Sequence, residues 1–83
     1  MIKEENWGVD IRRIRAFFRE QPDVAEEHGS FRFRSCRITL TESVSRDMVL
    51  WTIPRTVIRM EGGGEDLEAI YHRFFLQFLS AGG

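Results

Sequence analysis

Phenylalanine and arginine alternate at residues 31–34, within the stretch SFRFRS. Arginine can bind a phosphate while an exposed aromatic ring stacks on a base, which is how many proteins hold single-stranded nucleic acid. Alternating apolar and polar side chains are also the ordinary pattern of a β-strand with one face in the core and one in water. Both interpretations stay open, and the strand explains the pattern without any ligand.

Further arginines precede this stretch on one side of a predicted helix. They fall within a narrow arc, so helix and strand would form a joint basic surface if they are neighbours. The net charge of the chain provides no electrostatic attraction to nucleic acid, since 12 basic and 13 acidic residues sum to -1. We therefore favour pairing between basic and acidic blocks and keep a nucleic-acid-binding domain as the alternative function. Its candidate residues are Arg12, Arg15, Arg19, Arg32 and Arg34.

Residues with catalytic or metal-binding potential are too scattered to predict a site. Glu68 and His72 are four apart on one helix face, but the other half of an acid-base or metal site is missing. Cys36 is the only thiol, so it can form no internal disulfide. Acidic residues follow the glycines at 62–64, where a phosphate-binding loop needs a lysine, so these glycines predict a hinge. We expect no enzyme, no cofactor and no metal site.

A first helix is predicted from apolar residues at spacings of four, three and four. It is expected to begin at Asn6 or Asp10, because both side chains can cap a helix, and to end or kink before Pro22. Residues 22–29 predict one further helical turn that ends at Gly29. The apolar stripe consists of Trp7, Ile11, Ile14 and Phe18, with Phe17 beside it.

Strands are predicted downstream of this helix, where the period changes to two. The first covers residues 30–41, and a shift of the apolar phase along it places a β-bulge near Ser35. Residues 41–46 predict a turn, and residues 48–53 a second strand. Pro54 cannot donate a hydrogen bond within a sheet, so the chain leaves the sheet or bulges there before a third short strand at residues 56–60.

A second helix is predicted over residues 67–79, after acidic residues that suit a helix N-terminus. The order of helix, two or three antiparallel strands and helix predicts a small α+β domain with both helices packed on one sheet face. This order resembles that of double-stranded-RNA-binding domains, but the second helix begins with acids where those domains carry lysines. No family resemblance extends over the chain as a whole.

Length and composition restrict the class of protein. Residues 1–83 are enough for a single domain, and 42% hydrophobic with 30% charged residues is the composition of an ordinary globular protein. No apolar run reaches the length of a signal peptide or a membrane span. We expect a complete, cytoplasmic protein, bacterial in style, with no membrane association and no small-molecule substrate.

The second helix carries the main functional prediction. Its apolar arc covers about half of its circumference, and Leu76 lies outside that arc, between polar neighbours. Either the first helix and Trp7 cover the excess, or a homodimer or another protein does. The leading function is a non-enzymatic protein-interaction module, an adaptor or regulatory subunit, that self-associates through this helix. Its candidate residues are Arg73, Phe75, Leu76 and Leu79.

Overall fold

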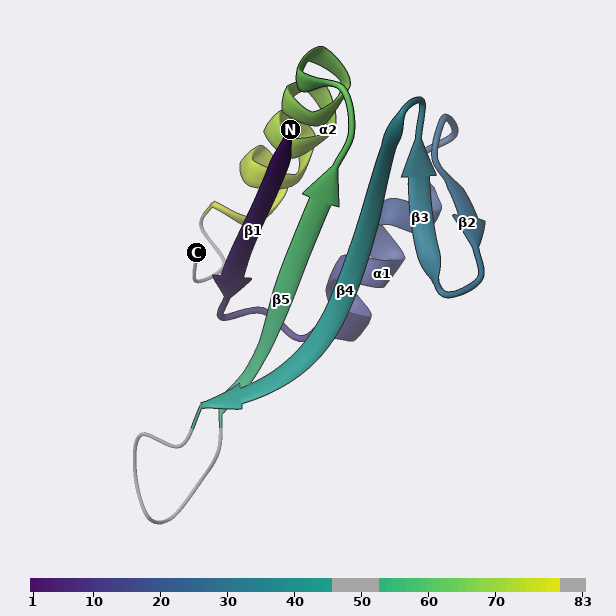
Figure 1. The fold of residues 1–83 in the computed structure, drawn as a ribbon. Helices are drawn as coiled ribbons and strands as arrows, with labels where there is room; N and C mark the ends of the chain where they lie inside the picture. Colours follow the sequence, from purple (N-terminus) through teal and green to yellow (C-terminus); the bar gives the residue numbers. More distant parts are fainter. Residues whose placement is uncertain (46–52, 80–83) are drawn as a thin grey trace.

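The computed structural model describes residues 1–45 and 53–79, which form an α+β fold with one antiparallel sheet and two helices (Figure 1). Five strands in the described residues pair in the order β1-β5-β4-β3-β2. Along the chain the elements are β1 (Ile2–Trp7), α1 (Ile11–Glu20), β2 (Ala25–Glu27), β3 (Ser30–Phe33), β4 (Cys36–Ser45), β5 (Ile53–Glu61) and α2 (Gly64–Phe78).

The predicted order of one helix, two or three strands and one helix is wrong, because two further strands belong to the sheet. The first is β1, which lies at one edge and pairs with β5. Its Trp7 ends a strand rather than beginning a helical stripe, and α1 starts only after Asp10, whose side chain caps it by accepting from the Arg12 N–H at 2.8 Å. A six-residue strand of mixed polarity becomes stable through its distant partner strand, which local sequence does not reveal.

The second unpredicted strand is β2, where residues 22–29 were expected to form one further helical turn. β2 pairs with β3 through a two-residue turn at His28 and Gly29, whose φ values are 50° and 81°. Positive φ at both central residues is typical of the tight turn that joins antiparallel strands. The bulge predicted near Ser35 is also a turn: Phe33 pairs with Cys36, and Arg34 has a φ of 54°.

β4 and β5 form the long hairpin at the centre of the sheet. Residues 41–45, predicted as a turn, continue β4, and the strand predicted at 56–60 is confirmed as part of β5. The strand predicted at 48–53 lies almost entirely outside the described residues. Pro54 pairs opposite Val44, beyond the end of β1, so its missing N–H faces no neighbouring strand. From there the hairpin extends past both neighbours as a two-stranded ribbon (Figure 1).

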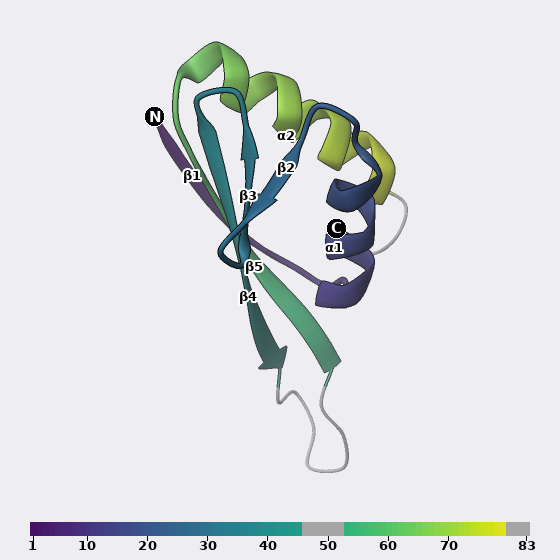
Figure 2. The same ribbon diagram turned by 90° about the vertical axis from the view of Figure 1, so that its right-hand side faces the viewer.

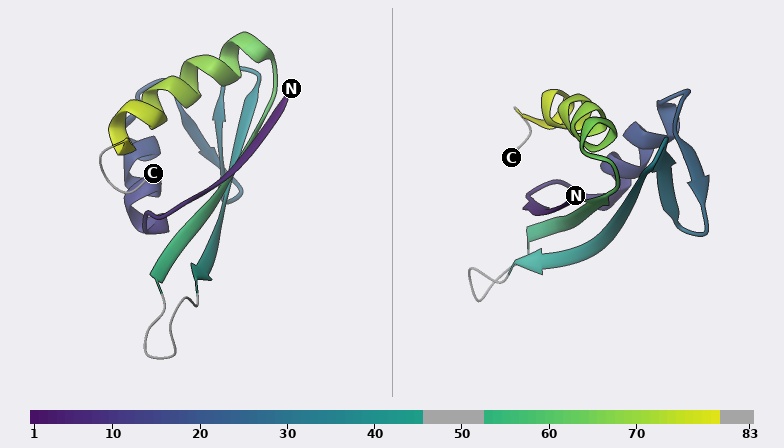
Figure 3. Two further views of the ribbon diagram at one scale, coloured as in Figure 1. Left: turned by 90° about the vertical axis from the view of Figure 1, so that its left-hand side faces the viewer. Right: turned by 45° about the horizontal axis from the view of Figure 1, so that its top comes forward.

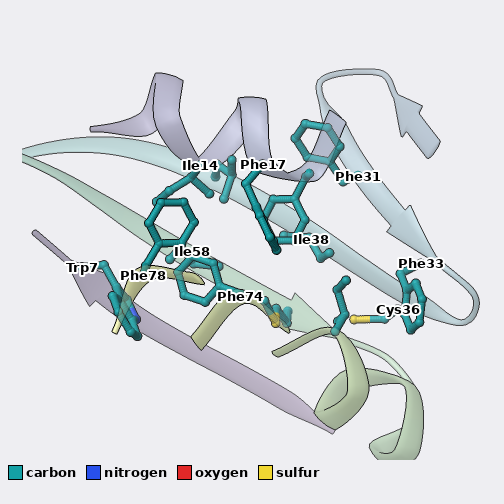
Figure 4. Packing of buried hydrophobic residues seen from close by; sticks show 14 of the residues in the cluster. Trp7, Ile14, Phe17, Phe31, Phe33, Cys36, Ile38, Ile58, Phe74 and Phe78 are labelled. Carbon is teal, nitrogen blue, oxygen red and sulfur yellow. The ribbon is translucent and has the colours of Figure 1, made fainter. Parts of the chain in front are cut away.

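Both helices lie on the same face of the sheet, and the core fills the space between them and the strands (Figure 2). Alternate strand residues point into this core, among them Phe31, Phe33, Ile38 and Ile58. Phe74 of α2 lies at its centre, with ring centroids 4.8 Å from Trp7 and 5.2 Å from Phe78 (Figure 4). Trp7 and α1 thus cover much of the apolar arc of α2 within one copy of the chain.

The glycines at 62–64 form a close-packed connection, which corrects the predicted hinge. The Gly62 N–H donates to the Met1 carbonyl at 3.0 Å, and the Gly63 N–H donates to Ser35 Oγ at 3.1 Å. Ser35 Oγ in turn donates to the carboxylate of Asp66 in the first turn of α2 at 2.6 Å. The turn between β3 and β4 therefore holds the beginning of α2 in place.

Candidate interaction surface

A shallow apolar hollow lies where the edge strand β1 meets the C-terminal half of α2. Figure 3 (left) views the sheet from this side, with β1 crossing in front of the other strands and α2 beside it. The hollow has a volume of about 410 Å³. Its lining consists of Glu5, Asn6, Trp7, Tyr71, Phe75 and Leu79.

Exposed leucines lie at this hollow and next to it: Leu79 lines it, and Leu76 follows Phe75 of its lining, whereas Met1 and Ile2 line a separate hollow at the start of β1. Among the described residues, the large hydrophobic side chains that remain exposed are Met1, Ile2, Leu76 and Leu79. Leu76 is 60% exposed and Leu79 is 54% exposed, whereas Phe75 between them and the core is half-buried. We call Phe75, Leu76 and Leu79, together with the hollow, the β1–α2 surface. Such a patch is typical of a site that another molecule covers.

A polar cluster fixes the wall of the hollow. Glu5 Oε1 accepts hydrogen bonds from Trp7 Nε1 at 2.9 Å and from Tyr71 Oη at 2.8 Å. The Lys3 ammonium lies 4.2 Å from the centre of the Tyr71 ring, within the range of a cation–π interaction. One carboxylate thus orients two aromatic rings.

The hydroxyl of Tyr71 should titrate abnormally in the folded protein. Burial, and secondarily the hydrogen bond to Glu5, raises its pKa from 10.0 to about 12. Because the folded pKa is the higher one, the unfolded chain loses this proton first, and stability falls as the pH rises between these two values. Tyr71 is the only tyrosine, so phenolate absorbance reports it alone.

We expect a titration midpoint of about 12 for the native protein and the ordinary value in urea. Glu5→Gln should lower the native midpoint only in part, because burial is the larger cause. In the Tyr71→Phe variant, the loss of stability over this pH range should be smaller than in the original chain. An ordinary midpoint in the native protein would contradict the buried, hydrogen-bonded hydroxyl.

Three of the four predicted interaction residues lie on the β1–α2 surface, and Arg73 does not. Its guanidinium binds both carboxylate oxygens of Asp23, at 2.8 and 2.9 Å, and lies 5.1 Å from the centre of the Phe33 ring. Arg73 therefore acts within one copy, on the opposite flank of α2. The contributions of Glu5 and Tyr71 to the hollow were missed. The sequence pattern that could have indicated this side of the hollow is the alternation that places Lys3, Glu5 and Trp7 on one face, provided that residues 2–7 are interpreted as a strand.

The arginines of the nucleic-acid alternative do not form one surface. Those on α1 lie on the helix-bearing side of the sheet, whereas Arg32 lies on the other face. Most are paired with acids: Arg12 with Asp10, Arg19 with Glu26, Arg32 with Glu27 and Arg34 with Asp66, at 2.8, 2.9, 2.9 and 3.6 Å. Arg15 has no ion pair within residues 1–45 and 53–79. These contacts favour mutual neutralisation of the charged blocks.

The remaining reactive side chains lie apart from the β1–α2 surface or from one another. Cys36 is fully buried, and burial raises the pKa of its thiol, which disfavours the reactive thiolate. In the part of the chain that the structure describes, no three metal-ligating side chains come together. Neither described helix is long and apolar enough to cross a membrane. Comparison of the chain with protein-family models, curated proteins and solved structures found no match.

Proposed function

We propose that this chain is a protein-interaction module that binds a second copy of itself through the β1–α2 surface. The observation that carries the proposal is the exposure of Leu79 in the lining of the hollow, together with that of Leu76, which follows Phe75 of the same lining. Exposed leucines around a half-buried aromatic residue resemble the apolar centre of a protein interface. In a two-fold symmetric dimer the same surface of both copies forms one interface, so a single contact covers the exposed leucines of both.

Phe75 is suited to be the anchor of this interface. Its ring lies 6.0 Å from both Trp7 and Tyr71, so it is held by the core on one side while its other side borders the hollow. An aromatic side chain that is already ordered loses little conformational entropy on binding. Leu79, one helical turn further on, extends the apolar surface away from Phe75.

Replacing Leu76 with glutamate is expected to abolish self-association without unfolding the chain. The charge would need to be desolvated in the interface, whereas Leu76 is exposed in the single copy and contributes little to its core. Analytical ultracentrifugation over a range of concentrations measures the association, and circular dichroism checks the fold.

The matched control is Gln77→Glu, which adds the same charge at the next exposed position but on the other flank of α2. This control should associate like the original chain. The proposal is wrong if the original chain sediments as a single copy at every concentration, or if Leu76→Glu is folded and still dimeric.

A further inference from the structure

We infer that β1 pairs antiparallel with β1 of a second copy, centred on Glu4, so that two sheets join into one. This inference rests on the proposed self-association and names the contact that sets its geometry. An extended strand at the edge of a sheet can bind another strand through its backbone. In Figure 3 (left), no described element lies in front of β1 on that side.

The hydrogen bonds between β1 and β5 show which backbone groups face the free edge. Met1 and Gly62 exchange two hydrogen bonds, each of 3.0 Å, and backbone direction alternates along an antiparallel strand. The odd residues of β1 therefore face β5, and Ile2, Glu4 and Asn6 present their N–H and C=O groups outward. Of these groups, the Asn6 carbonyl accepts from Arg55 Nη2 at 3.3 Å.

The charges of β1 select one register among the symmetric ones. Opposite residues must point to the same face, so a two-fold axis can pass beside Lys3, Glu4 or Glu5. An axis beside Lys3 places Lys3 opposite Lys3 of the other copy, and an axis beside Glu5 places Glu5 opposite Glu5. In both registers the two like charges repel each other. Centring on Glu4 places Lys3 opposite Glu5 twice and Glu4 opposite Glu4 once, so opposite-charge pairs outnumber the like pair. Charges on an edge strand commonly oppose strand pairing, but here they favour this one register.

The same register suits the rest of the molecule. A two-fold axis perpendicular to the sheet keeps both copies of α2 on one face, with the hollows beside β1, lined by Phe75 and Leu79, turned toward each other. On the other face of the joined sheet, Glu4 of one copy lies opposite Glu4 of the other. In each copy Arg59 Nη1 lies 3.2 Å from the Glu4 carboxylate of the same copy, which offsets the repulsion. The opposite edge is less suited, since β2 has three exposed residues, two of them glutamates.

Charge exchange tests the register. Lys3→Glu alone and Glu5→Lys alone each place like charges opposite in both contacts, so the dissociation constant of the dimer should rise about tenfold or more. Mixing the two variants restores both opposite-charge contacts and should restore association, measured by sedimentation of a fluorescently labelled partner. No association in the mixture, with both variants folded, would overturn the inference.

A second measurement does not depend on Glu5, whose loss affects Trp7 and Tyr71. With Glu4→Cys, the two new thiols lie opposite each other, about 5.5 Å apart between Cα atoms, within reach of a disulfide. Copper–phenanthroline should link this variant rapidly and link the control Asn6→Cys, which lies opposite Ile2, far more slowly. Equal linking would overturn the inference. The proposed function stands and this register fails under one combination of results: Leu76→Glu disrupts the dimer, Lys3→Glu leaves the dissociation constant unchanged, and Glu4→Cys is linked no faster than Asn6→Cys.

Discussion

Replacing Phe74 with alanine is expected to lower the free energy of unfolding by about 3–5 kcal/mol, as for other buried phenylalanines. Phe74 is fully buried, and its ring contacts four aromatic rings that come from both helices and from β1. Removal of the ring leaves a cavity that this set of large, rigid side chains cannot close. Domains of this size have only about 5–15 kcal/mol of stability, so a large unfolded fraction is expected.

Urea denaturation followed by tryptophan fluorescence measures this effect. The control is Leu76→Ala on the same helix, where most of the side chain is already in water. Because Leu76 belongs to the proposed interface, both variants are compared at a concentration at which the chain is monomeric. A loss below about 1 kcal/mol for Phe74→Ala would show that the aromatic cluster does not hold the helices on the sheet.

Replacing Gly62 with alanine is expected to cost about 1–3 kcal/mol, the range for forced backbone shifts. A Cβ atom at this position would lie 2.6 Å from both the Cα atom of Cys36 and the carbonyl oxygen of Ser35. These are backbone atoms of the turn that holds the start of α2, so relief of the clash must move β4 or β5. The loss of stability should appear in urea denaturation.

Gly64→Ala is the matched control for Gly62→Ala. It lies two residues further on, at the first position of α2, where a Cβ would meet only the Met1 side chain at an ordinary 3.5 Å. Alanine favours a helix over glycine, so this variant should be as stable as the original chain or slightly more stable. Equal effects at the two positions would contradict the close approach at Gly62.

The sequence predicts the parts of this fold whose pattern is local. Asp10 is a typical cap, and the apolar periodicity of α2 persists over four turns, so both helices can be found from their own residues. β1 could not be found in this way, because its partner β5 lies some fifty residues away and its inward side includes Lys3 and Glu5. The two tight turns were missed because His28 and Arg34 adopt positive φ, which glycine and asparagine adopt far more often.

The candidate surface was predicted in half. Leu76 could be singled out because a leucine between His72 and Arg73 on the polar side of a helix is unusual, and the structure places it in water. The other half comes from β1, so it depends on tertiary pairing. For the same reason the role of Arg73 could not be predicted, since its partner Asp23 lies fifty residues earlier.

The length of the central hairpin divides the sheet into regions of different resistance to opening. Near Ile38 and Ile58, β4 and β5 have neighbours on their outer sides and a core beneath them, so their amides should exchange with solvent only when the whole domain unfolds. From Ser43 onward the two strands pair only with each other, and an isolated two-stranded ribbon is marginally stable. Its amides should exchange through local opening, which leaves the helices and the edge strand in place.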